Sequence, residues 1–242
     1  MSIARFHCPV PLASGERLIL PDAVARHAVA ALRLRTGDTV ILFNGDGVEY
    51  LATLHRDGKQ VAALLGERRA PERESPLEIT LAQGISSGER MDYTLQKAVE
   101  LGVTHIQPVL MRRTVVRLDS DKRQRRQQHW QAVAISACEQ CGRNRIPEVA
   151  PILDFEAWIV RPRSAGVDYM LDPEGTLRLH ARAAPEGRIC LLAGPEGGFD
   201  PGEREIARTR GFQPLRLGPR ILRTETAAVA ALAAFQALWG DL

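Results

Sequence analysis

Residues 191–199, LLAGPEGGF, and residues 215–227, LRLGPRILRTETA, are the stretches that decide the fold of this chain. In each, an apolar, strand-like segment runs into a glycine-containing loop that leads into a predicted helix. Loops of this kind present backbone N–H groups at a helix start, where they can hold a small polar ligand. Because ligands of open α/β sheets sit beyond the carboxyl ends of strands, the two loops predict one shared pocket. Glycine and proline by themselves favour two ordinary turns, so the interpretation depends on the residues around them.

From residue 77 onward the sequence alternates between strand-like and helix-like segments. This alternation predicts an α/β domain with a mostly parallel sheet and helices on both faces. The last helix carries little polar surface, so we expect it to be buried, either under the sheet or against a second subunit. The expected strands are 77–83, 103–110, 167–171, 188–193 and 212–217, and the expected helices are 89–101, 119–141, 154–160, 176–182, 201–210 and 224–239.

The first part of the chain has a different, β-rich pattern. A turn at residues 44–47, NGDG, lies between two strand-like segments and predicts a hairpin. Several short strands with a single helix indicate a small barrel. The expected strands are 16–20, 39–43, 48–54 and 60–65, and the expected helix is 22–32.

Residues 68–76, RRAPERESP, contain two prolines and five charges without apolar periodicity, which indicates a linker. We therefore expect a first domain over residues 1–70, a linker over 71–76 and a second domain over 77–242.

Size and composition are those of an ordinary globular protein, with 242 residues of which 45% are hydrophobic and 25% charged. No stretch approaches the roughly 18 consecutive apolar residues of a membrane span. The N-terminus lacks the apolar core of a signal peptide, so we expect a cytoplasmic protein without a membrane contact. Four cysteines are too few for a disulfide scaffold of this length.

Basic residues cluster in the middle of the chain. Residues 112–126 contain seven basic side chains against two acidic ones, although the net charge of the chain is only +3. Most of them are arginine, which binds phosphate in a forked geometry and stacks on nucleic-acid bases. The local surplus predicts a surface that follows a phosphate backbone. A solvated helix face accounts equally well for any single arginine in this segment.

The predicted pocket favours a nucleoside over a nucleotide. Leu217, Ile221 and Leu222 can hold a flat ring such as adenine, and nearby backbone amides can read the ring's edge. Neither loop has the G-x-x-x-x-G-K-[ST] pattern of a phosphate-binding loop, and no G-x-G-x-x-G opens a first βα unit.

These residues resemble the cofactor-binding signature of the SPOUT methyltransferases, and more narrowly that of the RsmE-type enzymes, which methylate N3 of a uridine in small-subunit (16S) ribosomal RNA. The resemblance extends over essentially the whole chain, and the combination of motifs is highly specific. The matching stretches are Gly194–Gly198, Leu217–Ala227, Gln96–Val103, Glu139–Gln140 with Arg143 and Pro147, and Arg5–Phe6.

The resemblance implies a PUA-like RNA-binding β-barrel followed by an α/β SPOUT domain with a trefoil knot. It also implies S-adenosylmethionine as cofactor, a homodimer, and ribosomal RNA, in the assembled 30S particle, as substrate. The implied cofactor-binding residues are Leu171, Gly194, Glu196, Gly197, Gly198, Leu217, Gly218, Ile221 and Leu222. The candidate RNA-binding residues are Arg5, Arg33, Arg112, Arg113, Arg123 and Arg143.

Methylation of a uridine N3 requires that the N3–H first lose its proton. A nearby cation favours the anionic base, and a carboxylate can accept the proton. We select Arg223 for the first role, and Glu139 and Glu225 as candidate bases. Glu225 is equally well explained as an acid at a helix start, and Glu139 as the partner of an arginine.

Two further functions remain open from the sequence. One is a noncatalytic RNA-binding or ribosome-assembly factor with the same fold, and the other is a SPOUT methyltransferase acting on transfer RNA. A metal site is not expected. Cys138 and Cys141 have C-x-x-C spacing but no second pair of ligands, and His105 and His129 are scattered.

Overall fold

The computed structural model describes residues 3–58, 60–179 and 182–242. The chain divides into two compact units, which are described separately below. The first unit contains residues 1–74 together with 138–146, and the second contains 75–137 together with 147–242. Residues 138–146 thus join the first unit, although they follow it in sequence by more than sixty positions. No sequence pattern indicated this return, and the expected boundaries at 70 and 77 stay a prediction.

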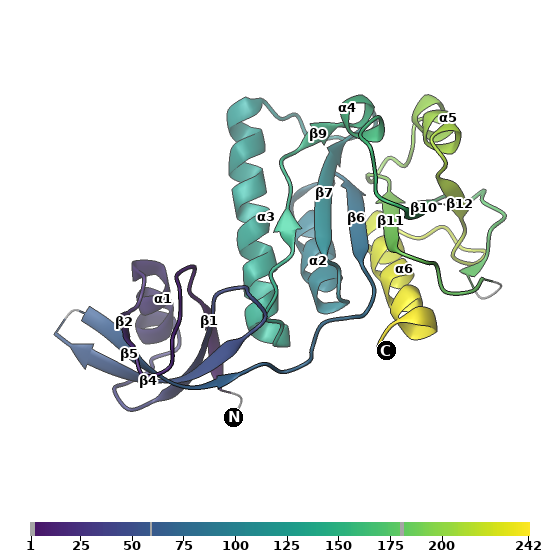
Figure 1. Ribbon diagram of the computed structural model, residues 1–242. Helices are drawn as coiled ribbons and strands as arrows, with labels where there is room; N and C mark the ends of the chain where they lie inside the picture. Colours follow the sequence, from purple (N-terminus) through teal and green to yellow (C-terminus); the bar gives the residue numbers. More distant parts are fainter. Residues whose placement is uncertain (1–2, 59, 180–181) are drawn as a thin grey trace. The chain divides into compact units, whose positions relative to one another are not determined.

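The first unit is built on a five-stranded sheet with the order β1-β3-β4-β5-β2, and the expected small β-rich domain is confirmed (Figure 1). β1 pairs parallel to β3, whereas the other neighbours are antiparallel. Its core includes Phe6, Leu42 and Leu54, which are almost fully buried. The strands are β1 (Ala4–His7), β2 (Arg17–Ile19), β3 (Thr39–Phe43), β4 (Glu49–Asp57) and β5 (Gln60–Arg69); helix α1 (Asp22–Arg26) continues into a wide π-type turn, η1 (His27–Ala31).

The second unit contains a seven-stranded sheet in which every strand pair is parallel. The strand order is β12-β10-β11-β6-β7-β8, with β9 also pairing with β7. The expected α/β class with a mostly parallel sheet is therefore confirmed. The strands are β6 (Ile79–Gly84), β7 (His105–Leu110), β8 (Glu148–Val149), β9 (Leu153–Asp154), β10 (Gly166–Leu171), β11 (Arg188–Ala193) and β12 (Gln213–Leu215).

Helices cover both faces of this sheet (Figure 1). On one face, Phe155 and Trp158 of α4 and Ala207 of α5 pack in a cluster with Met170 and Leu192 of the sheet. On the other face, α6 lies against the sheet and beside α2, and its Phe235 contacts the ring of Tyr169. The buried, alanine-rich α6 thus packs within its own unit. The helices are α2 (Gly88–Glu100), α3 (Ser120–Cys141), α4 (Phe155–Ile159), α5 (Pro201–Thr209) and α6 (Thr224–Trp239).

The expected helix over residues 176–182 is wrong for residues 176–178, which are not helical. Leu177 instead forms a parallel bridge with Leu215, and the Leu177 carbonyl accepts a hydrogen bond from the Arg216 N–H. This segment extends the sheet next to β12, which offsets the loss of helical hydrogen bonds. Residues 180–181 lie outside the described part of the chain.

The chain crosses itself at the carboxyl ends of β10 and β11. It leaves β12 at the edge of the sheet, passes these strand ends through residues 216–223, and begins α6 beside α2. The Asp172 N–H binds the Leu215 carbonyl at 2.9 Å, and the Thr224 hydroxyl binds the Gly194 carbonyl at 2.5 Å. The trefoil knot expected from the resemblance depends on this crossing. Within the described residues, no helix is long and apolar enough to cross a bilayer.

Candidate functional site

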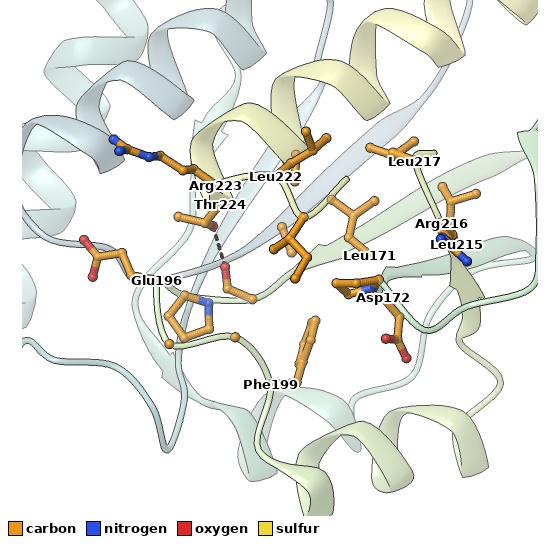
Figure 2. Close-up of a pocket in the computed structure, with 18 of the residues that line it drawn as sticks. Leu171, Asp172, Glu196, Phe199, Leu215, Arg216, Leu217, Leu222, Arg223 and Thr224 are labelled. Atoms are coloured by element: carbon orange, nitrogen blue, oxygen red, sulfur yellow. Dashed lines mark hydrogen bonds between the residues drawn. The ribbon is translucent and has the colours of Figure 1, made fainter. Parts of the chain in front are cut away.

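A cavity of about 310 Å³ opens where three strand-end loops of the second unit meet (Figure 2). The loops follow β10, β11 and β12, which are neighbours in the sheet or one strand apart. All nine residues expected from the sequence to bind the cofactor line this cavity. They are Leu171, Gly194, Glu196, Gly197, Gly198, Leu217, Gly218, Ile221 and Leu222.

The wall of the cavity is largely apolar. Leu171 and Leu215 come from strand ends, Leu217 and Leu222 from the loop before α6, and Phe199 from the loop before α5. Figure 2 shows these side chains gathered around one space. Such walls suit a flat aromatic ring, while loop backbone atoms provide hydrogen-bonding groups at its edge.

Gln83 joins the strand ends beneath the cavity, and the sequence analysis missed it. Its side chain is fully buried at the end of β6. The amide nitrogen, Nε2, donates to Gly84 O at 2.9 Å, to the Thr224 hydroxyl at 3.1 Å and, more weakly, to Gly194 O at 3.4 Å. One side chain therefore connects β6, the β11 loop and the first residue of α6. A glutamine at the end of an otherwise apolar strand was the available signal.

Two glycines allow the loops their conformations. A Cβ on Gly84 would lie 2.5 Å from the Pro195 nitrogen, so only glycine lets the β11 loop approach β6 this closely. Gly218 has a φ of +83°, in the left-handed region that other residues rarely adopt. A Cβ there would meet no atom within 4 Å, so the backbone at Gly218 is open on the side where a side chain would project.

Glu196 anchors the β11 loop to the start of α2. Its Oε1 accepts hydrogen bonds from the Ser87 N–H at 3.1 Å, the Ser87 hydroxyl at 2.5 Å and Arg90 at 2.7 Å. Burial alone would raise the pKa of this carboxyl, but these hydrogen bonds lower it below its ordinary value. The ionised form of Glu196 is thus the one that holds the loop.

Cations surround the mouth of the cavity. Arg113, expected to bind RNA, lines it and donates to the Gly197 carbonyl at 3.2 Å. Arg216 donates to the Gly218 carbonyl at 2.8 Å, which holds the loop that carries Leu217. Asp172 is buried and accepts a hydrogen bond from Arg208 at 3.2 Å. The arginines of this region therefore support loop backbone and strand-end carboxylates.

The three candidate catalytic residues have different surroundings. Arg223 precedes α6 and lines the cavity, and in Figure 2 its side chain points away from the apolar space, on the side of Glu196. Glu225 lies in the first turn of α6, 4.0 Å from Arg90, and its Oε2 is buried without a hydrogen-bond partner. It does not line the cavity.

Glu139 belongs to the first unit. Its Oε1 accepts a hydrogen bond from the His7 N–H at 2.9 Å. Burial raises the pKa of Glu139, which is the direction a general base requires. The structure thus brings Arg223 to the cavity and leaves both candidate bases outside its lining.

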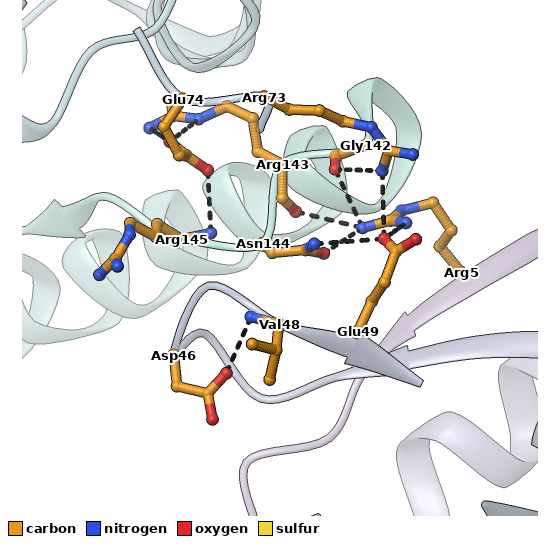
Figure 3. A network of polar contacts seen from close by, with 10 residues as sticks. All are labelled: Arg5, Asp46, Val48, Glu49, Arg73, Glu74, Gly142, Arg143, Asn144 and Arg145. Atoms are coloured by element: carbon orange, nitrogen blue, oxygen red, sulfur yellow. Dashed lines mark hydrogen bonds and ion pairs between the residues drawn. The ribbon is translucent and has the colours of Figure 1, made fainter. Parts of the chain in front are cut away.

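Two arginines expected to bind RNA form ion pairs inside the first unit (Figure 3). Arg5 contacts Glu49 and Asn144, each at 2.5 Å, and Glu49 is 3% exposed. Arg143 is 4% exposed and binds Glu74 through Nε and Nη2, at 2.9 and 2.7 Å. Contact of either arginine with an RNA phosphate would require these ion pairs to open.

The remaining candidate RNA-binding arginines are more exposed. Arg33 lies on the surface of the first unit with a φ of 56°. Arg112 pairs with Asp200 at 3.3 Å, and Arg123 forms a two-fold contact with Asp154 at 2.9 and 3.1 Å. Among the residues that the structure describes, no group of three or more histidine, cysteine or acidic side chains is placed to hold a metal ion.

Comparison with known proteins gives matches over both units. The family model described as RNA methyltransferase domain matches residues 73–236, and the one described as RNA methyltransferase PUA domain matches residues 20–64. The ribosomal RNA small subunit methyltransferase E of Buchnera aphidicola is 32% identical, covering 99% of this chain and 95% of that protein. Its namesake from Bacillus subtilis is 32% identical, with 86% and 85% covered.

Solved structures are also similar. The crystal structure of ribosomal RNA small subunit methyltransferase E from Neisseria gonorrhoeae bound to S-adenosyl methionine has a TM-score of 0.93 at 42% identity. A putative methyltransferase from Legionella pneumophila in complex with the same cofactor has a TM-score of 0.96 at 38% identity. Each match covers the whole of both chains.

Proposed function

This chain belongs to the RNA methyltransferase family that contains the ribosomal RNA small subunit methyltransferase E (RsmE-type) proteins, and we propose that it methylates N3 of a uridine in 16S ribosomal RNA. The chain is an S-adenosylmethionine-dependent enzyme, a function that the relatives with bound cofactor support. The observation that carries the proposal is the cavity: loops from three strands converge on one apolar space with open backbone at its edge.

The residues present fit S-adenosylmethionine. Leu171, Phe199 and Leu217 provide apolar contact for an adenine ring, and the open backbone at Gly218 leaves space that a side chain would fill. No phosphate-binding loop is present in the sequence, and the cofactor carries no phosphate. When bound, the cofactor supplies a methyl group already activated by its sulfonium sulfur, so positioning provides much of the catalysis.

Within this proposal, Arg223 stabilises the uridine anion that forms when the N3–H loses its proton. It lines the cavity, and a cation next to a developing negative charge lowers the barrier. Glu225 and Glu139 are the candidate proton acceptors. We favour Glu225, because it lies in the same unit, two positions after Arg223, and has an Oε2 that no hydrogen bond occupies.

RNA recognition is assigned to both units. The PUA-domain match supports RNA binding by the first unit, where Arg33 is exposed. In the second unit, Arg113 lies at the cavity mouth, with Arg112 and Arg123 on exposed surface nearby in sequence. We propose that the substrate is recognised within the assembled 30S particle, which places the protein in the cytoplasm.

A homodimer is the assembly we propose. α2 and α6 pack side by side and leave Tyr93 and Leu238 about half exposed. Apolar side chains of this kind on adjacent helices are suited to be covered by a second copy. Sedimentation of the purified chain at micromolar concentration tests this assembly.

The enzyme assay uses naked 16S RNA, assembled small subunits and transfer RNA as parallel substrates. Mass spectrometry of the digested RNA should show 3-methyluridine in ribosomal RNA. Product confined to transfer RNA, or cofactor binding without any product, would overturn the assignment. Arg223→Ala should leave cofactor affinity near normal and lower turnover by about 100-fold or more. Equal loss of binding and turnover would contradict the role of Arg223.

A further inference from the structure

A second hollow, of about 400 Å³, lies in the second unit on the segment before α3 and the first turns of that helix. We call it the basic hollow. It shares no lining residue with the cofactor cavity. Its arginines and lysine belong to the segment 112–126, for which the sequence predicts a phosphate-binding surface, but none of them is among the six arginines named as candidate RNA contacts. It is lined by Val116, Arg117, Leu118, Lys122, Arg125, Arg126 and His129.

Among the described residues, the arginines of the basic hollow form no ion pair with a carboxylate. In this they differ from four of the six arginines selected from the sequence, namely Arg5, Arg112, Arg123 and Arg143. Within the described part of the chain, no acidic side chain lies within 4.0 Å of Arg117, Arg125 or Arg126, whereas Arg112 and Arg123 both form ion pairs. Arg125 donates only to a backbone carbonyl, at a long 3.4 Å. The charge of Asp119 acts on Arg125 but also pairs with Lys122, so these arginines keep a surplus of positive charge that a bound polyanion would offset.

The other polar groups of the basic hollow are already engaged. Lys122 pairs with Asp119 at 2.9 Å, but both side chains are more than half exposed, so this pair contributes little and exchanges easily. His129 contacts Asp92 at 2.8 Å. The side chains of the hollow that remain available to bind a charged ligand are therefore its arginines.

Apolar side chains accompany these cations. Val116 and Leu118 line the hollow, and the adjacent Val115 is 68% exposed. A free phosphate ion would need only the cations, whereas an RNA strand presents phosphates together with the apolar faces of sugars and bases. Arginine can bind both the phosphates and the bases of an RNA strand, because its guanidinium group forms paired hydrogen bonds with phosphate and stacks on bases.

We propose that the basic hollow binds the sugar–phosphate backbone of the substrate RNA, at a position separate from the nucleotide that is methylated. This inference rests on the proposed function, since it takes RNA as the polyanion. Arg117 and Arg126 bind phosphates, and Val116 and Leu118 contact a sugar or base.

The test is the double variant Arg117→Gln/Arg126→Gln, assayed with 16S RNA and with assembled small subunits. The matched control is Arg161→Gln/Arg210→Gln, which removes the same charge from exposed positions of the same unit. A second variant, Arg117→Lys/Arg126→Lys, keeps the charge. Calorimetric titration with S-adenosylmethionine verifies that each variant is folded.

The primary measurement is the dependence of RNA affinity on salt. Two lost phosphate contacts should flatten the slope of log K against log salt concentration by about 1.4 for a single strand and about 1.8 for a duplex. KM for RNA should rise while kcat at saturating RNA stays the same. The control and the lysine variant should keep the wild-type slope.

The outcomes separate this inference from the proposed function. If wild type binds and methylates RNA and the glutamine variant has the same slope and KM as the control, the inference is wrong and the proposed function stands. An acidic protein partner in the hollow would give that same result with RNA. If wild type binds RNA without methylating it and the slope still flattens in the glutamine variant, the hollow is an RNA site and the proposed function fails.

Discussion

Thr224→Val tests whether the connection between the β11 loop and α6 builds the cofactor site. The substitution replaces a hydroxyl by a methyl group and keeps the branched shape of the side chain. The hydroxyl donates to Gly194 O at 2.5 Å and accepts from Gln83 Nε2 at 3.1 Å. Both Gly194 and Thr224 line the cavity.

The magnitude follows from the groups left behind. Gln83 Nε2 keeps its bond to Gly84 O at 2.9 Å, whereas Gly194 O keeps only the longer contact with Gln83, at 3.4 Å. Loss of these two hydrogen bonds, which leaves the Gly194 carbonyl poorly satisfied, costs about 1–3 kcal/mol in total. If about 1.4 kcal/mol of this cost is lost from the free energy of cofactor binding, the Kd for S-adenosylmethionine rises about tenfold.

Isothermal titration with S-adenosylmethionine measures this Kd, and urea denaturation measures the free energy of unfolding. Thr224→Ser keeps the hydroxyl and should bind as wild type does. Thr226→Val places valine in the same helical turn at an exposed position and controls for helix propensity. Equal affinity of Thr224→Val and Thr226→Val would refute the idea that this hydroxyl holds the site together.

Three further predictions follow from the charged groups. In single-turnover methylation, Glu225→Gln should lower the rate at least tenfold, whereas Glu139→Gln should leave the rate within about twofold of wild type. A larger loss of rate in Glu139→Gln than in Glu225→Gln would make Glu139 the base. The pKa of Glu196 is lowered in the folded chain, so the stability that its carboxylate contributes is present above the ordinary value of 4.5 and is lost as pH falls through the folded pKa. The difference in unfolding free energy between wild type and Glu196→Gln should therefore be constant from pH 8 to about pH 5 and shrink below that. A difference that grew on acidification would contradict this prediction. Glu49→Ala leaves the buried Arg5 without its counter-charge and should cost about 3–5 kcal/mol in urea unfolding; a loss under about 1 kcal/mol would mean that water or another group already compensates Arg5.

The internal ion pairs of the first unit also affect how its basic residues are interpreted. Arg5 and Arg143 were candidates for RNA contact because of their residue type and their positions in matching motifs. In the structure they hold residues 138–146 against the rest of the first unit, through Glu49, Asn144 and Glu74. An arginine in a matching motif can therefore stabilise the domain that binds RNA without touching RNA itself.

The sequence by itself determined the parallel α/β class and the small β-rich first domain, and its resemblance to the RsmE-type enzymes pointed to nine of the residues that line the cavity. The two features of the fold depend on properties that act over a few neighbouring residues, namely apolar periodicity, turn residues and the conformations open to glycine. For the same reason the helix expected over residues 176–182 was wrong at its start: the local pattern favoured a helix, but β12 offered Leu177 a strand partner.

Only the tertiary structure decided which charges are free and which polar groups join the loops. Arg5 meets its partners 44 and 139 positions away, and Gln83 meets Thr224 after 141 positions. Nothing in the local sequence identifies such partners, because ionic and hydrogen-bonding energies depend on distances that the fold alone sets. The same principle identifies the basic hollow: among the residues that the structure describes, its arginines form no ion pair, whereas Arg112 and Arg123 of the same segment do.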